Sequence, residues 1–78
     1  MQIFIKLNSG KTVTLNADVS DLVNSIKHKI AEKGGLPERF QRLIFSGKEL
    51  EGDRPLGDYN IQSENTIFEV CRIYPKRN

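Results

Sequence analysis

The spacing of apolar residues changes once along the chain, and this change constrains the fold most. In the first part, apolar side chains recur at every second position, which in a β-strand places them all on one face. These positions are Ile3, Ile5, Leu7, Val13 and Leu15. Residues 8–10 read Asn-Ser-Gly, and such residues favour a turn. The pattern therefore predicts two strands joined as a hairpin, with one face toward the core.

After the hairpin, the apolar residues recur at steps of three and four, which is the period of an amphipathic helix. They are Val23, Ile26 and Ile30. Ser20 or Asp21 is expected to cap the start of this helix, because a short polar side chain accepts a hydrogen bond from the first turn. Gly34-Gly35 is expected to end it, since glycine takes the left-handed cap conformation at little cost.

Further strands are expected at Arg42–Phe45, in a short return that begins at Glu49-Leu50, and at Thr66–Ile73. Residues 52–57 are expected to form a loop, with Leu56 and Ile61 as the apolar anchors beneath it. Two strands, one helix and then more strands predict an α+β domain with a mixed sheet curled around the helix.

Length and composition set the outer limits. Seventy-eight residues suffice for one small domain, and a net charge of +2 is too small to indicate nucleic-acid binding. No apolar run approaches the roughly 18 residues that cross a membrane, and the N-terminus lacks the pattern of a signal peptide. A single cysteine excludes an internal disulfide and favours a reducing cytoplasmic or nuclear setting. We expect neither nucleic acid nor membrane as a partner.

The residue types that carry catalysis are scarce. His28 is the only histidine and lies off the apolar stripe of the expected helix, so we interpret it as a surface residue. Cys71 has no neighbouring base and is interpreted as a small apolar strand residue. One histidine and one cysteine cannot supply the four ligands of a structural zinc site. We therefore expect no catalytic residue, no metal and no cofactor.

Four short blocks of sequence carry a family resemblance. They are Met1–Lys6, Gly10–Thr12, Gln41–Leu50 and Asp58–Gln62. Together they resemble the ubiquitin family, without a gap, over residues 1–73. The resemblance implies the β-grasp arrangement, with four to five strands wrapped on one helix. It also implies a ubiquitin-like domain at residues 1–73 and a tail, or the start of a linker, at 74–78.

The resemblance stops near the C-terminus. The family carries Arg-Gly-Gly where this chain has Tyr74-Pro75-Lys76, so the part used for covalent attachment is missing. This implies a non-conjugating, monomeric interaction domain that engages ubiquitin receptors, namely proteasome subunits, ubiquitin-binding helices or deubiquitinating enzymes. Two alternatives stay open: a divergent ubiquitin-type modifier and a free-standing mimic of ubiquitin.

The resemblance also implies a binding surface. Members of the family bind partners through an apolar patch on the outer face of the sheet. The matching positions, with their neighbours, are Asn8, Arg42, Ile44, Gly47, Lys48, Phe68, Val70 and Arg72. Phe68 replaces a histidine and adds apolar area, whereas Asn8 replaces a leucine and removes it. Period-two alternation agrees that Phe68 and Val70 share a face; the alternative is a local cluster with no external role.

Lysines stand at the positions where ubiquitin is linked into chains. They are Lys6, Lys11, Lys27, Lys29, Lys33 and Lys48, while Ser63 replaces one such lysine. The resemblance implies acceptors of further ubiquitin at these positions. We favour the simpler interpretation, that they are solvated charges.

Two departures from the family concern the fold. Glu69 stands where an inward-facing leucine is expected, and an unpaired buried carboxylate would cost several kcal/mol. Either the strand edge is displaced, or Glu69 reaches solvent or a basic partner, with Leu7 refilling the space. Lys27 lies near the buried helix face and needs an anionic partner, for which Asp53 is the nearest candidate.

Overall fold

The structure is a computed structural model, in which residues 1–72 are described. Its elements, in chain order, are β1 (Gln2–Lys6), β2 (Thr12–Asn16), α1 (Val23–Glu32), the 3₁₀ turn η1 (Glu38–Phe40), β3 (Gln41–Phe45), β4 (Lys48–Glu49), the 3₁₀ turn η2 (Leu56–Tyr59) and β5 (Thr66–Cys71). The strands form one sheet in the order β2-β1-β5-β3-β4. Strand β1 runs parallel to β5, and the other pairs are antiparallel.

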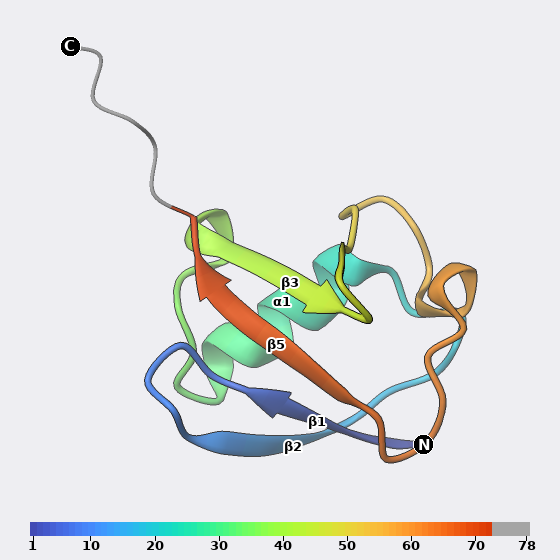
Figure 1. Ribbon diagram of the computed structural model, residues 1–78, viewed down its shortest axis with the longest axis horizontal. Helices are drawn as coiled ribbons and strands as arrows, with labels where there is room; N and C mark the ends of the chain where they lie inside the picture. Colours follow the sequence, from blue (N-terminus) through green and yellow to red (C-terminus); the bar gives the residue numbers. More distant parts are fainter. Residues whose placement is uncertain (73–78) are drawn as a thin grey trace, which may run out of the picture.

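Helix α1 lies across one face of this sheet (Figure 1). The core between the two layers contains the side chains of the two periodic patterns, except Val13, which is only half-buried, together with apolar residues of the other elements. Its buried members are Ile3, Ile5, Leu7, Leu15, Ala17, Val23, Ile26, Ile30, Leu43, Leu50, Leu56, Ile61 and Ile67. The predicted α+β class and the mixed β-grasp sheet are confirmed. Leu56 and Ile61, the predicted anchors of the loop at 52–57, are buried as expected.

The β3–β4 hairpin turns tightly. Ser46 and Gly47 both have positive φ, at 52° and 77°. Two consecutive left-handed residues make the type I′ turn, whose twist matches that of antiparallel strands. The turn sets the register, so that Glu49 pairs with Ile44 and Lys48 with Phe45.

The start of α1 differs from the sequence prediction. The helix begins at Val23 after Leu22, and no side chain caps it, so the expected cap by Ser20 or Asp21 is wrong. The first N–H groups instead donate to carbonyl oxygens of the loop before η2: Val23 to Arg54 and Asn24 to Gly52, each at 2.9 Å. Backbone groups distant in sequence thus satisfy the donors that a polar cap would have satisfied.

The end of α1 agrees with the prediction. The helix stops at Glu32, and Gly34 follows with φ +100°. The N–H of Gly35 donates back to the carbonyl of Ile30 at 2.9 Å, which closes the last turn.

Glu69 is the main polar exception in the core. Glu69 is only 3 % exposed, which excludes the alternative in which its side chain reaches solvent. Its two carboxylate oxygens accept hydrogen bonds from the backbone N–H groups of Asn8, at 3.0 Å, and Leu36, at 2.9 Å. Two backbone donors therefore take the place of the basic partner that the sequence suggested. Leu7 is buried beside it, as anticipated.

The remaining bounds need small adjustments. Strand β3 begins at Gln41, one residue earlier than predicted, and β5 is described to Cys71. The predicted end of that strand at Ile73, and the predicted tail at 74–78, lie outside the described residues. Within residues 1–72, no helix has the length and apolar character that crossing a membrane requires.

Candidate protein-binding surface

Three apolar side chains lie together on the sheet face opposite α1, and we call them the outer patch: Ile44, Phe68 and Val70. Ile44 and Phe68 are direct cross-strand partners on β3 and β5. Phe68 is 50 % exposed, and the other two are half-buried. On β5 the neighbours Ile67 and Glu69 are buried, so strand alternation alone turns Phe68 and Val70 outward.

The other predicted neighbours of the patch lie in or beside two turns. Gly47 lies in the β3–β4 turn, and Lys48 begins β4 and pairs with Phe45, the residue after Ile44; both are exposed. Asn8 is exposed in the β1–β2 turn, and its backbone N–H is the donor held by Glu69. The structure therefore presents the side chain of Asn8 to solvent from a turn whose backbone is tethered.

The two predicted arginines share one carboxylate. Arg42 donates to Oε1 of Glu49 at 3.2 Å, and Arg72 donates to Oε2 of the same residue at 2.9 Å. Burial alone would raise the pKa of Glu49, but the hydrogen bonds and charges of the two guanidinium groups outweigh it and hold that pKa below its usual range. We call these residues the arginine–glutamate cluster.

Glu49 was missed at the level of sequence, although a signal for it exists. Ser46-Gly47 is a two-residue turn, and such a turn places residue 49 opposite residue 44. Arg42 lies two residues before Ile44 on the same face, which is within diagonal reach of Glu49 for a long side chain. The geometry of a two-residue hairpin turn, applied to the sequence, therefore predicts that Arg42 and Glu49 lie close together.

The lysines fall into two groups. Lys6, Lys11, Lys33 and Lys48 are exposed, and Lys27 and Lys29 are half-buried. The ammonium of Lys29 donates to the carbonyl of Asn16 at 3.0 Å and lies 3.8 Å from a carboxylate oxygen of Asp21. Lys29 is thus engaged within the fold.

Lys27 does not form the expected pair. Within residues 1–72, no carboxylate lies within 4.0 Å of its ammonium, and Asp53 is exposed, so the predicted Lys27–Asp53 contact is wrong. Burial, followed by the charge of Arg72, lowers the pKa of Lys27, while Glu49 and Glu38 pull it upward. The main-chain carbonyl of Lys27 accepts a hydrogen bond from the side-chain amide of Gln41.

His28 is exposed, as predicted, but it is not isolated. Its Nδ1 lies 2.7 Å from Glu38 of η1, and its Nε2 lies 3.2 Å from Glu32 one helical turn away. The hydrogen bond to Glu38, with the charges of both carboxylates, raises the pKa of His28. Cys71 is a free, half-buried strand residue. Among residues 1–72, no three histidine, cysteine or acidic side chains are arranged to hold a metal ion.

Comparison with known proteins agrees with the fold. The model of the ubiquitin family matches residues 3–73. The chain is 36 % identical to the ubiquitin-like protein NEDD8 of Dictyostelium discoideum over 73 residues, which are 94 % of this chain and 95 % of that protein. It is 34 % identical to ubiquitin-like protein 1 of Schizosaccharomyces pombe over 94 % of each chain.

Another relative is longer. Ubiquitin-like protein 4A of Rattus norvegicus is 39 % identical over 76 residues, which are 97 % of this chain but only 48 % of that protein. A family model that covers nearly the whole chain, together with relatives above 30 % identity, establishes the relationship. The chain belongs to the ubiquitin family.

Proposed function

We propose that this chain is a non-conjugating, non-enzymatic interaction domain that binds ubiquitin receptors through the outer patch. The candidate receptors are proteasome subunits, ubiquitin-binding helices and deubiquitinating enzymes of the cytoplasm or nucleus. The single observation that carries the proposal is the half-exposed ring of Phe68 beside Ile44. An exposed aromatic side chain next to aliphatic ones is the typical anchor of a protein interface.

The expected interface is small and weak. Three side chains and a polar rim support a contact area below about 1,200 Å². We expect dissociation constants of roughly 10 μM to 1 mM, which correspond to about −4 to −7 kcal/mol. Phe68 should contribute most, because its ring buries the largest apolar area at low entropic cost.

An NMR titration with a ubiquitin-interacting helix tests the proposal. Chemical shifts should change at residues 44–48 and 68–72, and Ile44→Ala or Phe68→Ala should abolish these changes. Val19→Ala is a matched control, since Val19 is also 50 % exposed but lies in the loop before α1. Binding that survives both patch variants, or that Val19→Ala weakens as strongly, would refute the assignment.

The non-conjugating part of the proposal rests on Tyr74-Pro75-Lys76, which lies outside the described residues. A bulky aromatic residue followed by a φ-restricted proline does not suit a narrow channel built for glycine. Incubation with ubiquitin-activating enzyme and ATP should therefore give no thioester. A reducible adduct of the chain would favour the alternative function, a divergent ubiquitin-type modifier. The chain's match to nearly the full length of some relatives supports that alternative.

A further inference from the structure

A cavity of about 480 Å³ opens beside α1, and it shares only Arg72 with the surroundings of the outer patch. Its lining comes from α1, from η1, from the first residue of β3 and from the residue directly after β5. The residues are Asn24, Lys27, Glu38, Arg39, Gln41 and Arg72. Three of them are cations and one is an anion, so the lining has a net positive charge.

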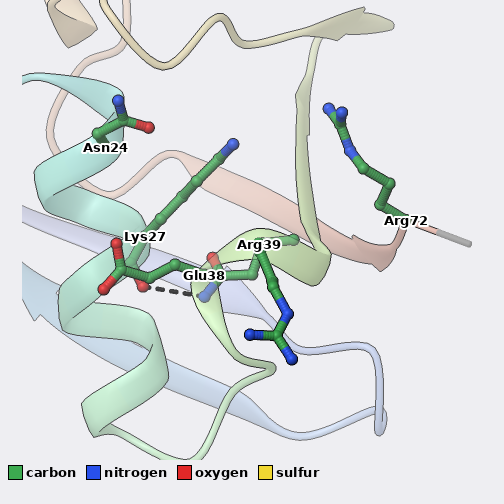
Figure 2. Close-up of a pocket in the computed structure, with 6 residues that line it drawn as sticks. Asn24, Lys27, Glu38, Arg39 and Arg72 are labelled. Carbon is green, nitrogen blue, oxygen red and sulfur yellow. Dashed lines mark hydrogen bonds between the residues drawn. The ribbon is translucent and has the colours of Figure 1, made fainter. Parts of the chain in front are cut away.

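Two of the cations face the same space. Figure 2 shows the Lys27 side chain extended from α1, with its ammonium between the amide of Asn24 and the guanidinium of Arg72, while Arg39 turns away. The charge of Arg72 is near enough to lower the pKa of Lys27, beyond the effect of burial. Two neighbouring cations repel each other, and an anion bound between them would remove that repulsion.

The nearby acidic groups are engaged elsewhere. The Glu38 carboxylate points to the opposite side from the Lys27 ammonium (Figure 2) and lies 2.7 Å from the ring of His28. Glu49 is ion-paired with Arg42, at 3.2 Å, and with Arg72 of the cavity itself, at 2.9 Å, so it is not a contact partner of Lys27. Half-buried Lys27 therefore has no ion-pair partner among residues 1–72, although the sequence indicated that it needs one.

The wall of the cavity also holds an unpartnered acceptor. Gln41 is 1 % exposed, and its amide nitrogen donates to the carbonyl oxygens of Lys27, at 2.9 Å, and Leu36, at 2.7 Å. Its Oε1 is buried without a hydrogen-bond partner in the described part of the chain. Buried acceptors are normally paired, so a donor is missing here.

We propose that this cavity binds a carboxylate side chain from an acidic segment of a partner protein, held between the Lys27 ammonium and the Arg72 guanidinium. One guanidinium nitrogen of Arg72 already donates to Glu49 at 2.9 Å, which orients the group, and its other N–H donors have no partner among residues 1–72 and can reach a second carboxylate. Arg39 adds positive charge at the rim. This site shares Arg72 with the surroundings of the outer patch, but it uses none of the three apolar side chains of that patch.

The test is an NMR titration at low ionic strength with acetyl-Gly-Asp-Glu-Asp-Gly-amide, since salt screens such contacts. The side-chain amide signals of Asn24 and Gln41 should shift in a saturable way, and the pKa of Lys27 should rise. The neutral peptide with Asn and Gln in place of the acids should not bind. Lys27→Met should weaken binding at least about fivefold, since it removes a charge-assisted hydrogen bond.

Lys33→Met is the matched control, because Lys33 is an exposed lysine directly after the same helix, and it should leave affinity within about twofold. Arg72→Gln is a second variant that should weaken binding even if Lys27→Met fails to fold. Equal losses from Lys27→Met and Lys33→Met, binding of the neutral peptide, or no saturable shift would each overturn the proposal.

Phe68→Ala separates this site from the proposed function. It should leave binding of the acidic peptide unchanged while abolishing binding of the ubiquitin-interacting helix. Loss of peptide binding in this variant would assign the peptide to the outer patch and refute the cavity site. If the acidic peptide binds but the ubiquitin-interacting helix does not, the proposed receptor surface is refuted and the cavity site stands.

Discussion

Glu69→Ala removes a buried carboxylate that joins two loops distant in sequence. One oxygen holds the N–H of Asn8 in the β1–β2 turn, and the other holds the N–H of Leu36 in the segment between α1 and η1. Glu69 is only 3 % exposed, so both bonds form where water competes little. The variant leaves two backbone donors without their acceptor.

The loss in the free energy of unfolding can be worked out from these two hydrogen bonds. A hydrogen bond to a charged group contributes about 1.5–3 kcal/mol, so two such bonds contribute about 3–6 kcal/mol. A cavity of about 190 Å³ adjoins the carboxylate, and water entering it recovers part of this energy. We expect a net loss of about 2–4 kcal/mol. A domain of this size is stabilised by roughly 4–12 kcal/mol, so the loss is a large fraction of the total.

Urea unfolding followed by circular dichroism measures the effect. Glu69→Gln should lose less than Glu69→Ala, because its amide oxygen still accepts one of the two bonds. Glu64→Gln is the control, since it removes the same charge at an exposed position and should change stability by less than about 0.5 kcal/mol. Glu69→Ala with wild-type stability, or with the same loss as the control, would refute the two-loop tether.

Three further predictions follow from the geometry. The hydrogen bond from His28 to Glu38 raises the pKa of the imidazole ring. The stabilisation from this contact is therefore complete below pH 6.5 and is lost as pH rises through the higher pKa of the folded state. An NMR titration of His28 should show the raised pKa, and Glu38→Gln should lower it. Burial lowers the pKa of Lys27, so its charged form is less stable in the folded state. Lys27→Met should therefore be neutral or stabilising in urea unfolding at pH 7, with a smaller benefit as pH rises through the lowered pKa. Gly35→Ala would place a Cβ against Ile30 Cγ2 and 2.9 Å from the Ile30 carbonyl oxygen. The free energy of unfolding should therefore fall by about 1–3 kcal/mol in the same urea assay. An unchanged urea midpoint would contradict this close approach.

The fold was predictable because local patterns determine most of it. Alternating apolar residues define the strands, the three-to-four spacing defines α1, and Gly34-Gly35 marks the end of that helix. The start of α1 was not predictable, since its first N–H groups bond to carbonyls of Gly52 and Arg54. A loop some 30 residues away supplies these acceptors, and no side chain near the helix start signals them.

The candidate site was predictable in part for the same reason. Strand alternation correctly indicated that Phe68 and Val70 share the outer face with Ile44. The partners of the charged groups were not foreseen. Sequence reasoning looked for an acid beside Lys27 and a base beside Glu69, because opposite charges are the obvious partners. The fold instead gives Glu69 two backbone donors and leaves Lys27 without an ion pair in the described chain.

Strand β5 links the stability of the fold to the shape of the proposed surface. Phe68 and Val70 face outward, while Glu69 between them faces inward and holds the N–H of Asn8. The turn that carries Asn8 is therefore anchored to the strand that carries the aromatic anchor. A preformed turn loses less conformational entropy on binding than a free one does. Glu69→Ala should therefore also weaken partner binding, seen as a higher dissociation constant at equal concentrations of folded protein, in addition to its effect on unfolding.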